Sequence, residues 1–242
     1  MTTEAPSKGT IEPHFDIETG GEVIGQNPLL QNGVKVVNLE GETVGAFLIN
    51  MQIPEGNTFN EGAWKYFWTK KEAQKEQLVS ILLTGIPMEE AQLALATFLG
   101  KFVNLGVKRA NWTARPAAFD FPPVKYWYDR TMGGKTINVD GTEMTAPPLG
   151  FKAFCDSTMR DVVAMVTGTN KNDVWAQWTE GGPPHTHNGY DDAASQQYAH
   201  ARGVEHIRSL AEDLREMKRL RTDNAPLQAR VAELEAELES LK

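Results

Sequence analysis

Cysteine is almost missing from the 242-residue sequence. Cys155 is the single cysteine, which excludes a disulfide within the chain. No apolar run approaches the length of roughly 18 residues that a membrane-spanning helix needs. The first residues also lack the basic and apolar regions of a secretory signal peptide. These absences predict a protein that is made in a reducing compartment and has no membrane partner.

The signatures of common enzyme sites are missing as well. The sequence has no nucleophile elbow, no Walker loop and no dinucleotide-binding fingerprint, and the double glycine before Lys135 lacks the spacing of a P-loop. His185 and His187 could share a metal ion, but no cysteine or third histidine lies near them in the sequence. The sequence therefore predicts a protein that is not an enzyme and that uses no metal and no cofactor.

Charge is distributed unevenly along the chain. The formal net charge is −8, yet residues 98–130 contain six Lys and Arg against two Asp, a net charge of +4. A basic segment with aromatic side chains is typical of a groove for a single-stranded nucleic acid. A core helix with a solvated basic rim has the same composition, so both interpretations stay open.

The pattern of apolar residues predicts a mainly α fold. Residues 1–33 are polar and favour a flexible N-terminal arm. Two β-branched runs around a turn with glycine predict a small β-hairpin at 34–53. This hairpin belongs to a mainly helical core domain at 34–179, in which apolar residues at helical spacing predict helices over 70–84, 87–105 and 151–166.

The C-terminal part is expected to be amphipathic helix. Glycine and proline predict a linker at 180–190, followed by C-terminal helices at 191–242 with a kink or a hairpin at 222–226. Apolar residues spaced alternately by four and three form a coiled-coil seam, which favours self-association over packing on the chain's own domain. The predicted seam consists of Leu227, Val231, Leu234, Leu238 and Leu241.

Three short motifs follow one another in the basic segment. They are KFVN from Lys101, NW at Asn111 and Trp112, and AAFDF from Ala117 to Phe121. In this order they resemble the core signature of the coat proteins of flexuous filamentous plant viruses, of the potexvirus and potyvirus kind. The resemblance covers about 40 residues. Coat proteins of that family are mostly helical, polymerise helically and hold single-stranded RNA in a groove.

The resemblance implies a coat or nucleocapsid protein of a helical capsid, located in the virion and the host cytoplasm. Its partners would be copies of itself in a filament and single-stranded RNA, bound without sequence specificity. An oligomeric structural or adaptor protein, which uses its C-terminal coiled coil and binds no nucleic acid, is the alternative. The residues implied in RNA binding are Lys101, Lys108, Arg109, Trp112 and Arg115, and those implied in structuring the groove are Phe119, Phe121 and Asp120, the last by pairing with Arg115.

Overall fold

The structure is a computed structural model that describes residues 9–150 and 153–240. It gives no side-chain detail for residues 226–228, 234 and 236–240. The chain forms two compact units, which divide between residues 201 and 202. None of the described helices is both long and apolar enough to cross a membrane.

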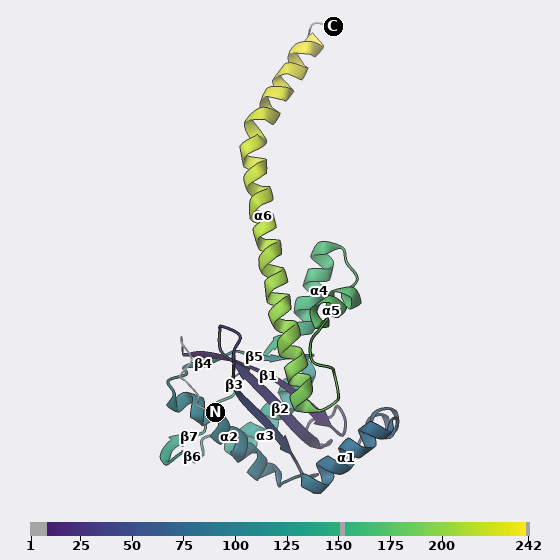
Figure 1. Ribbon diagram of the computed structural model, residues 1–242, viewed down its shortest axis with the longest axis vertical. Coiled ribbons are helices and arrows are strands. Elements are labelled where there is room, and N and C mark those ends of the chain that lie inside the picture. Colours follow the sequence, from purple (N-terminus) through teal and green to yellow (C-terminus); the bar gives the residue numbers. More distant parts are fainter. Residues whose placement is uncertain (1–8, 151–152, 241–242) are drawn as a thin grey trace. The chain divides into compact units, whose positions relative to one another are not determined.

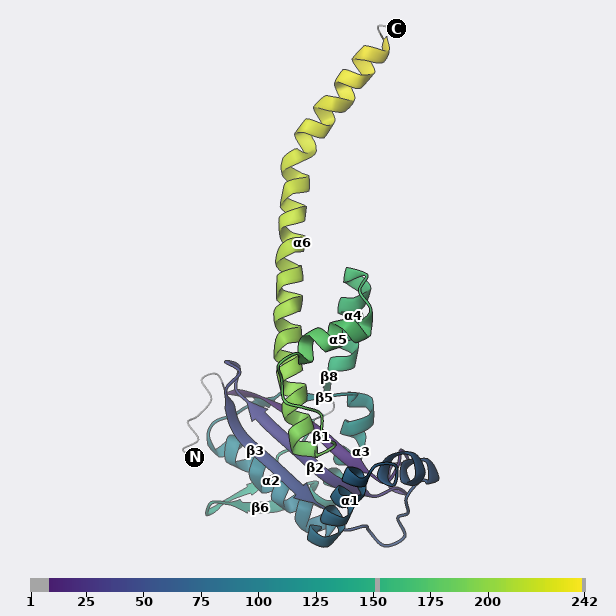
Figure 2. The same ribbon diagram turned by 45° about the vertical axis from the view of Figure 1, so that its right-hand side comes forward.

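A six-stranded sheet lies at the centre of the first unit (Figures 1 and 2). Its strand order is β3-β2-β1-β5-β8, and β4 also pairs with β1. The first three strands are antiparallel, whereas β4 and β5 run parallel to β1 and β8 runs parallel to β5. The strands are β1 (Thr10–Thr19), β2 (Leu29–Val37), β3 (Thr43–Asn50), β4 (Arg109–Ala110), β5 (Trp112–Ala114) and β8 (Ala153–Cys155), and a separate hairpin consists of β6 (Thr136–Val139) and β7 (Thr142–Thr145).

Helices cover both faces of this sheet. The described helices are η1 (Ala63–Trp68), a π-helix, α1 (Glu72–Thr84), α2 (Met88–Asn104), α3 (Ala117–Met132), α4 (Asp156–Thr167), α5 (Lys171–Thr179) and α6 (Gly189–Ser240). On one face, α2 and α3 bury Leu95 and Phe121 against Phe15 of β1 and Val34 of β2. The start of α6 lies against the opposite face (Figure 2). This arrangement makes β1 a central strand with both faces covered.

The prediction of a mainly α fold with a flexible N-terminal arm is wrong. Residues 10–19, which lie in the predicted arm, form β1. Polar and apolar residues alternate along this strand, a pattern that indicates a strand with one face in the core. The polar residues of this segment suggested an arm. In the fold, however, a helix buries the polar face of β1 as well. The predicted hairpin at 34–53 corresponds to β2 and β3, which belong to the large sheet instead of standing alone.

The second unit contains the C-terminal part of α6. This helix is continuous from Gly189 to Ser240, so the chain does not fold back as a hairpin at 222–226, one of the two predicted alternatives. Pro226 removes one backbone donor, and the helix runs through it nevertheless.

Two glycines bring the start of α6 close to the sheet. A Cβ atom added to Gly33 of β2 would overlap the backbone carbonyl group of Gly189. No side chain fits between these two backbones, so Gly33 permits a contact that any other residue would block. The backbone N–H of Gly189 also donates to Oε1 of Gln31, at 2.7 Å. The first turn of α6 is thereby fixed over β1 and β2.

Candidate active site

Strand β1 carries two buried acidic side chains on one face. Asp16 and Glu18 are two residues apart, so they point to the same side of the sheet. That side is the one against which α6 begins, and the residue paired with Asp16 on β2 is Gly33, which has no side chain. Asp16 is 8% exposed and Glu18 is 5% exposed. Two carboxyl groups are therefore buried side by side at the centre of the sheet.

Two helices bring two further carboxyl groups to the same place. Asp120 lies in the first turn of α3 and Asp192 in the first turn of α6, and both are buried. Carboxylate oxygens of Asp16, Glu18 and Asp192 all lie within 4.8 Å of one another. These three residues and Asp120 line one cavity of about 430 Å³. We call the four residues the acidic cluster.

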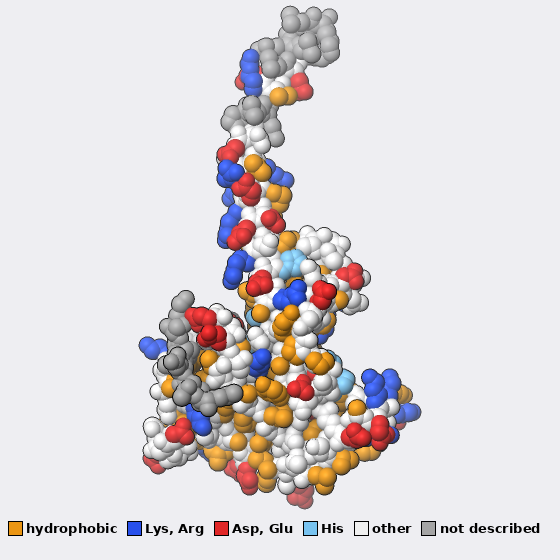
Figure 3. Space-filling view, viewed as in Figure 1, with side chains coloured by type: hydrophobic (Ala, Val, Ile, Leu, Met, Phe, Trp, Pro, Cys, Tyr) orange, Lys and Arg blue, Asp and Glu red, His pale blue; other side chains and the backbone are white. Residues whose placement is uncertain are grey.

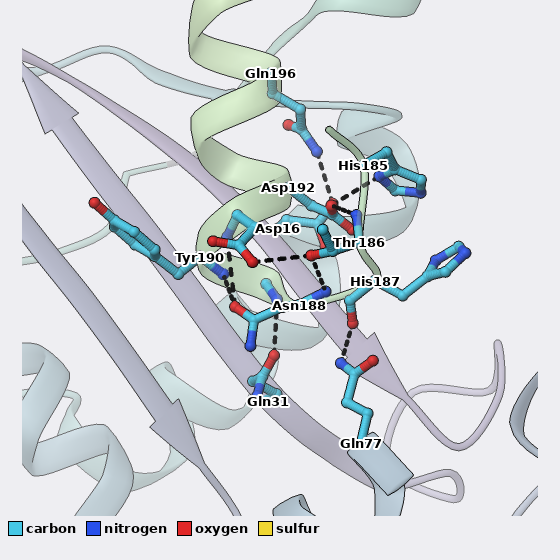
Figure 4. Close-up of polar contacts among 12 residues, drawn as sticks. Asp16, Gln31, Gln77, His185, Thr186, His187, Asn188, Tyr190, Asp192 and Gln196 are labelled. Carbon is cyan, nitrogen blue, oxygen red and sulfur yellow. Dashed lines mark hydrogen bonds and ion pairs between the residues drawn. The ribbon is translucent and has the colours of Figure 1, made fainter. Parts of the chain in front are cut away.

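Hydrogen bonds hold part of the acidic cluster and leave part of it without protein partners. Gln196 donates to Oδ1 of Asp16 at 2.6 Å, and the backbone N–H of Thr186 donates to Oδ1 of Asp192 at 2.8 Å. Figure 4 shows these side chains where the loop before α6 meets the sheet. Oδ2 of Asp120 and Oδ2 of Asp192 are buried and have no hydrogen-bond partner among the described residues. These oxygens are free to bind a ligand that supplies positive charge.

The pKa values of the acidic cluster also indicate a site for a positively charged ligand. Burial raises the pKa of Asp16 well above its usual value, and the charges of Asp120 and Asp192 raise it further. Burial and the neighbouring Asp16 raise the pKa of Glu18. Burial raises the pKa of Asp120 to about 8, although the backbone N–H of Arg115 donates to this carboxyl and partly offsets the effect. The cluster is a set of buried acids with too little positive charge beside them.

Two histidines flank the acidic cluster on the loop before α6. Nδ1 of His185 lies 2.9 Å from Oδ1 of Asp192. The ring of His187 lies 4.5 Å from that of His185 and 5.0 Å from that of Phe67, measured between centroids. Burial and the neighbouring His185 lower the pKa of His187, so its neutral form is favoured. A neutral imidazole on the wall of the cavity can accept a proton.

The backbone of His187 is held in an unusual conformation. Its φ angle is +62°, in the left-handed region that side chains other than glycine rarely adopt. The amide of Gln77 donates a hydrogen bond to the carbonyl oxygen of His187, and the hydroxyl of Thr186 donates to Asp191 at 3.0 Å. Such a conformation persists only where the surroundings impose it, and it is often found at functional sites.

The basic residues predicted to bind RNA lie in several places. Lys108 and Arg109 are exposed, and Arg109 pairs with Thr10 at the start of β1. Eight residue steps separate Thr10 from Glu18, about 27 Å along a strand. Lys101 is exposed on α2 and lies 3.9 Å from Asp140. These three basic residues are therefore not brought to the acidic cluster.

Of the predicted RNA-binding residues, Arg115 lines the cavity and Trp112 lies in the core. Trp112 is 4% exposed and packs against Phe15 and Phe121, with ring centroids 5.5 and 6.3 Å away. Its ring is covered by the protein, so it is not available to stack on a base. Arg115 lines the cavity together with the acidic cluster.

The predicted pairing of Asp120 with Arg115 is also contradicted. Only the backbone N–H of Arg115 bonds to Asp120, while its guanidinium lies over the ring of Trp175. Asp120 instead belongs to the acidic cluster. Of the two phenylalanines predicted to structure a groove, Phe119 is partly exposed on the wall of the cavity, and Phe121 is in the core.

The predicted self-association residues lie in the second unit. Val231 is 54% exposed. The side chains of Leu227, Leu234 and Leu238, and the whole of Leu241, lie outside the described residues.

Sequence reasoning missed the acidic cluster itself. A signal was present in the alternation of Phe15-Asp16-Ile17-Glu18, which places two acids on one face of a strand whose other face is apolar. The partners Asp120 and Asp192 come from positions about 100 and 175 residues further along the chain. Only the fold brings them together.

No protein-family model and no curated protein that was compared matches the chain. Solved structures do match its fold. One is a 3′-exonuclease described for 3′-end-specific recognition of a histone mRNA stem-loop, with a TM-score of 0.54 and 12% identity, and the match covers 82% of this chain and 64% of that one. Another is the nuclease domain of 3′hExo, a DEDDh family member bound to rAMP, with a TM-score of 0.52, 12% identity and coverage of 83% and 94%.

A third similar structure is the zinc-bound form of an E. coli exonuclease I complex with single-stranded DNA. Its TM-score is 0.53 at 13% identity, and the match covers 83% of this chain and 41% of that one. The chain thus spans less than two thirds of the first and third of these proteins. At such identities the likeness shows the fold alone.

These findings correct the predicted function. The fold resembles that of exonucleases, and the acidic cluster could hold a metal ion, which contradicts a helical coat protein, an adaptor and a protein that is not an enzyme. The findings give no support to a homopolymer. They do not test the motif resemblance itself or the predicted virion location.

Proposed function

We propose that the chain is an exonuclease that depends on divalent cations and removes nucleotides from the 3′ end of a single-stranded nucleic acid. The observation that carries this proposal is the acidic cluster, whose four buried carboxyl groups line one cavity with unpartnered oxygens. The exonuclease-like fold supports it. So do the residue types: Asp16, Glu18, Asp120, Asp192 and a histidine correspond in one-letter code to the name DEDDh.

The acidic cluster fits divalent cations that prefer oxygen ligands. Asp16, Glu18, Asp120 and Asp192 offer carboxylate oxygens only, which suit Mg²⁺ or Mn²⁺. The raised pKa values of Asp16, Glu18 and Asp120, and the Oδ2 atoms of Asp120 and Asp192 that have no hydrogen-bond partner among the described residues, indicate that protein groups do not balance this charge. When bound, such cations supply positive charge that stabilises a phosphodiester and lowers the pKa of water.

The residues around the cluster have distinct roles in this proposal. Gln196 holds the Asp16 carboxylate, and Thr186 holds that of Asp192. His187 lines the cavity beside the cluster and accepts the proton of the attacking water. Water adds to phosphorus, the bond to the 3′ oxygen of the preceding nucleotide breaks, and that oxygen takes up a proton. The products are a nucleoside 5′-monophosphate and a strand with a new 3′ hydroxyl.

The cavity itself suits the terminal nucleotide. Its volume of about 430 Å³ lies in the range of small-molecule sites. Phe67 and Phe119 lie on its wall, where aromatic rings can stack on a base of any kind. Stacking does not select a sequence, so degradation without sequence preference is expected. Single-stranded RNA, the partner predicted from the sequence, is the first substrate to test, next to single-stranded DNA.

The experiment is a time course with single-stranded RNA and DNA of about 20 nucleotides, labelled at the 5′ end, in Mg²⁺ or Mn²⁺. The unchanged protein should produce a ladder of successively shorter labelled strands. Asp16→Asn and Asp192→Asn should each slow it by at least about 100-fold, because phosphoryl transfer depends mainly on positioning and on stabilising charge in the transition state. Asp213→Asn, the same change at an exposed position of α6, is the matched control. Equal rates for Asp16→Asn and this control would contradict the proposal.

A further inference from the structure

A second cavity adjoins the one that contains the acidic cluster. Its volume is about 300 Å³. Both cavities are lined by Asp16, Asp192, Arg115 and His185. The remaining wall of the second cavity comes from α5, with Trp175, from the loop residues 182–184, and from α6, with Ser195 and Gln196. We call it the Trp175 cavity.

Arg115 lines both cavities, and its guanidinium group is stacked on an aromatic ring. Its guanidinium carbon is 3.4 Å from the centre of the Trp175 ring, a cation–π contact at close range. The side chain is half-buried, and among the described residues it forms no ion pair. The neighbouring Arg160 is paired with Asp161 at 2.6 Å. Arg115 thus keeps its N–H donors for a ligand.

A guanidinium in this place is suited to a phosphate. It presents several N–H donors in one plane, which matches the oxygens of a phosphodiester. A strand that approaches the acidic cluster meets carboxyl groups, and Arg115 is the cation that the structure places beside them on the wall of both cavities. Trp175 fixes the plane of the guanidinium, so little side-chain entropy is lost on binding.

We infer that the Trp175 cavity holds the nucleotide that precedes the scissile phosphate, and that Arg115, stacked on Trp175, binds a phosphate of that strand. This inference rests on the proposed function. A phosphodiester at the acidic cluster has a nucleoside on each side, and the two cavities on its two sides provide room for both. The substrate is therefore a strand of at least two nucleotides, and Arg115 and Trp175 set this requirement.

The test compares two substrates that differ only in the group leaving the phosphate. The p-nitrophenyl ester of thymidine 5′-monophosphate places one nucleoside at the cluster, whereas an oligothymidylate also fills the Trp175 cavity. The ratio of kcat/KM for the oligonucleotide to that for the ester should fall about tenfold or more in Arg115→Ala and Trp175→Ala. Most of the change should lie in KM for the oligonucleotide. Lys171→Ala, an exposed cation on α5, is the control.

Two further variants separate positioning from folding. Arg115→Lys keeps the positive charge but lacks the planar guanidinium group. Its ratio of kcat/KM values should therefore lie between that of Arg115→Ala and that of the unchanged protein. Trp175→Phe keeps an aromatic face and should recover more than Trp175→Ala, whose fold is checked by circular dichroism. A ratio that stays unchanged in Arg115→Ala, or an equal loss on both substrates, would overturn the inference.

The inference and the proposed function fail in different ways. If the unchanged protein hydrolyses neither substrate, the proposed function fails, and binding then decides the inference. Fluorescence anisotropy of a labelled oligothymidylate in Ca²⁺ should give a Kd about tenfold higher for Arg115→Ala than for the unchanged protein. Equal values would overturn the inference.

Discussion

Replacing Asp120 by asparagine should stabilise the metal-free protein. Burial raises the pKa of this carboxyl to about 8. In the unfolded chain its pKa is close to 3.9, so at pH 7 the folded state keeps a proton that the unfolded state has lost. About three pKa units at about 1.4 kcal/mol each set an upper limit near 4 kcal/mol.

The measured gain should be smaller than this limit. Water entry and small movements relieve part of the repulsion between buried charges, so about 2 kcal/mol is the expected effect. Asparagine has nearly the same shape, cannot ionise, and can donate to neighbouring carboxylates. For a chain of this size, about 2 kcal/mol corresponds to a rise in Tm of roughly 4–8 °C.

The sign of the pH dependence follows from the raised pKa. Asp120 contributes most favourably below about pH 4, where both states are protonated, and this contribution is lost as the pH rises toward 8. The advantage of Asp120→Asn should therefore be larger at pH 8 than at pH 5.5. Added Mn²⁺ should reverse the order, because it binds and stabilises the unchanged protein more.

The assay is thermal unfolding followed by circular dichroism, in EDTA and in Mn²⁺, at both pH values. Asp213→Asn is the control for the chemical change. A metal-free Asp120→Asn protein that melts below the unchanged one at pH 8 would refute the reasoning, because the acid would then not be a source of strain.

Three other changes probe the helix contact, the general base and the C-terminal helix. Gly33→Ala should lower nuclease activity at least about 100-fold and the Tm by several degrees, since a Cβ atom would meet the backbone of Gly189. An unchanged Tm would count against the tight contact. His187→Ala should lower kcat about 100-fold with little change in KM, while His185→Ala has the smaller effect, and the opposite order would assign the base to His185. Self-association along α6, where exposed apolar side chains lie among charged ones (Figure 3), remains a prediction. Val231→Asp should lower the molecular mass measured by sedimentation. An unchanged protein that is monomeric in this measurement would contradict the prediction.

The spacing of apolar residues predicted a helix correctly where that spacing alone determines the element. It was misleading where packing in the folded protein buries polar residues. The apolar spacing of 87–105 indicated a helix, and α2 occupies Met88–Asn104. The polar residues of β1 suggested an arm, because composition does not reveal that a helix will bury the second face of a strand. Pro226 suggested a kink or a hairpin at 222–226, and the helix runs through this proline without folding back.

The candidate site was hidden by distance along the chain. Asp16 and Glu18 lie two residues apart on the same face of β1, but Asp120 and Asp192 join them only through the packing of α3 and α6. Closeness in the sequence favoured a pairing of Asp120 with Arg115, whereas the guanidinium of Arg115 lies over the ring of Trp175. The four acidic residues can be read from the sequence, but only the fold of the sheet and its helices shows that they lie together.

The most direct test of the proposed function is the product formed from single-stranded RNA. The unchanged protein is incubated with the RNA in Mn²⁺ and in EDTA, and the small products are identified by mass spectrometry. We expect nucleoside 5′-monophosphates in Mn²⁺, none in EDTA, and none with Glu18→Gln. Intact RNA in Mn²⁺, with DNA also left intact, would contradict the claim that the acidic cluster is a nuclease site.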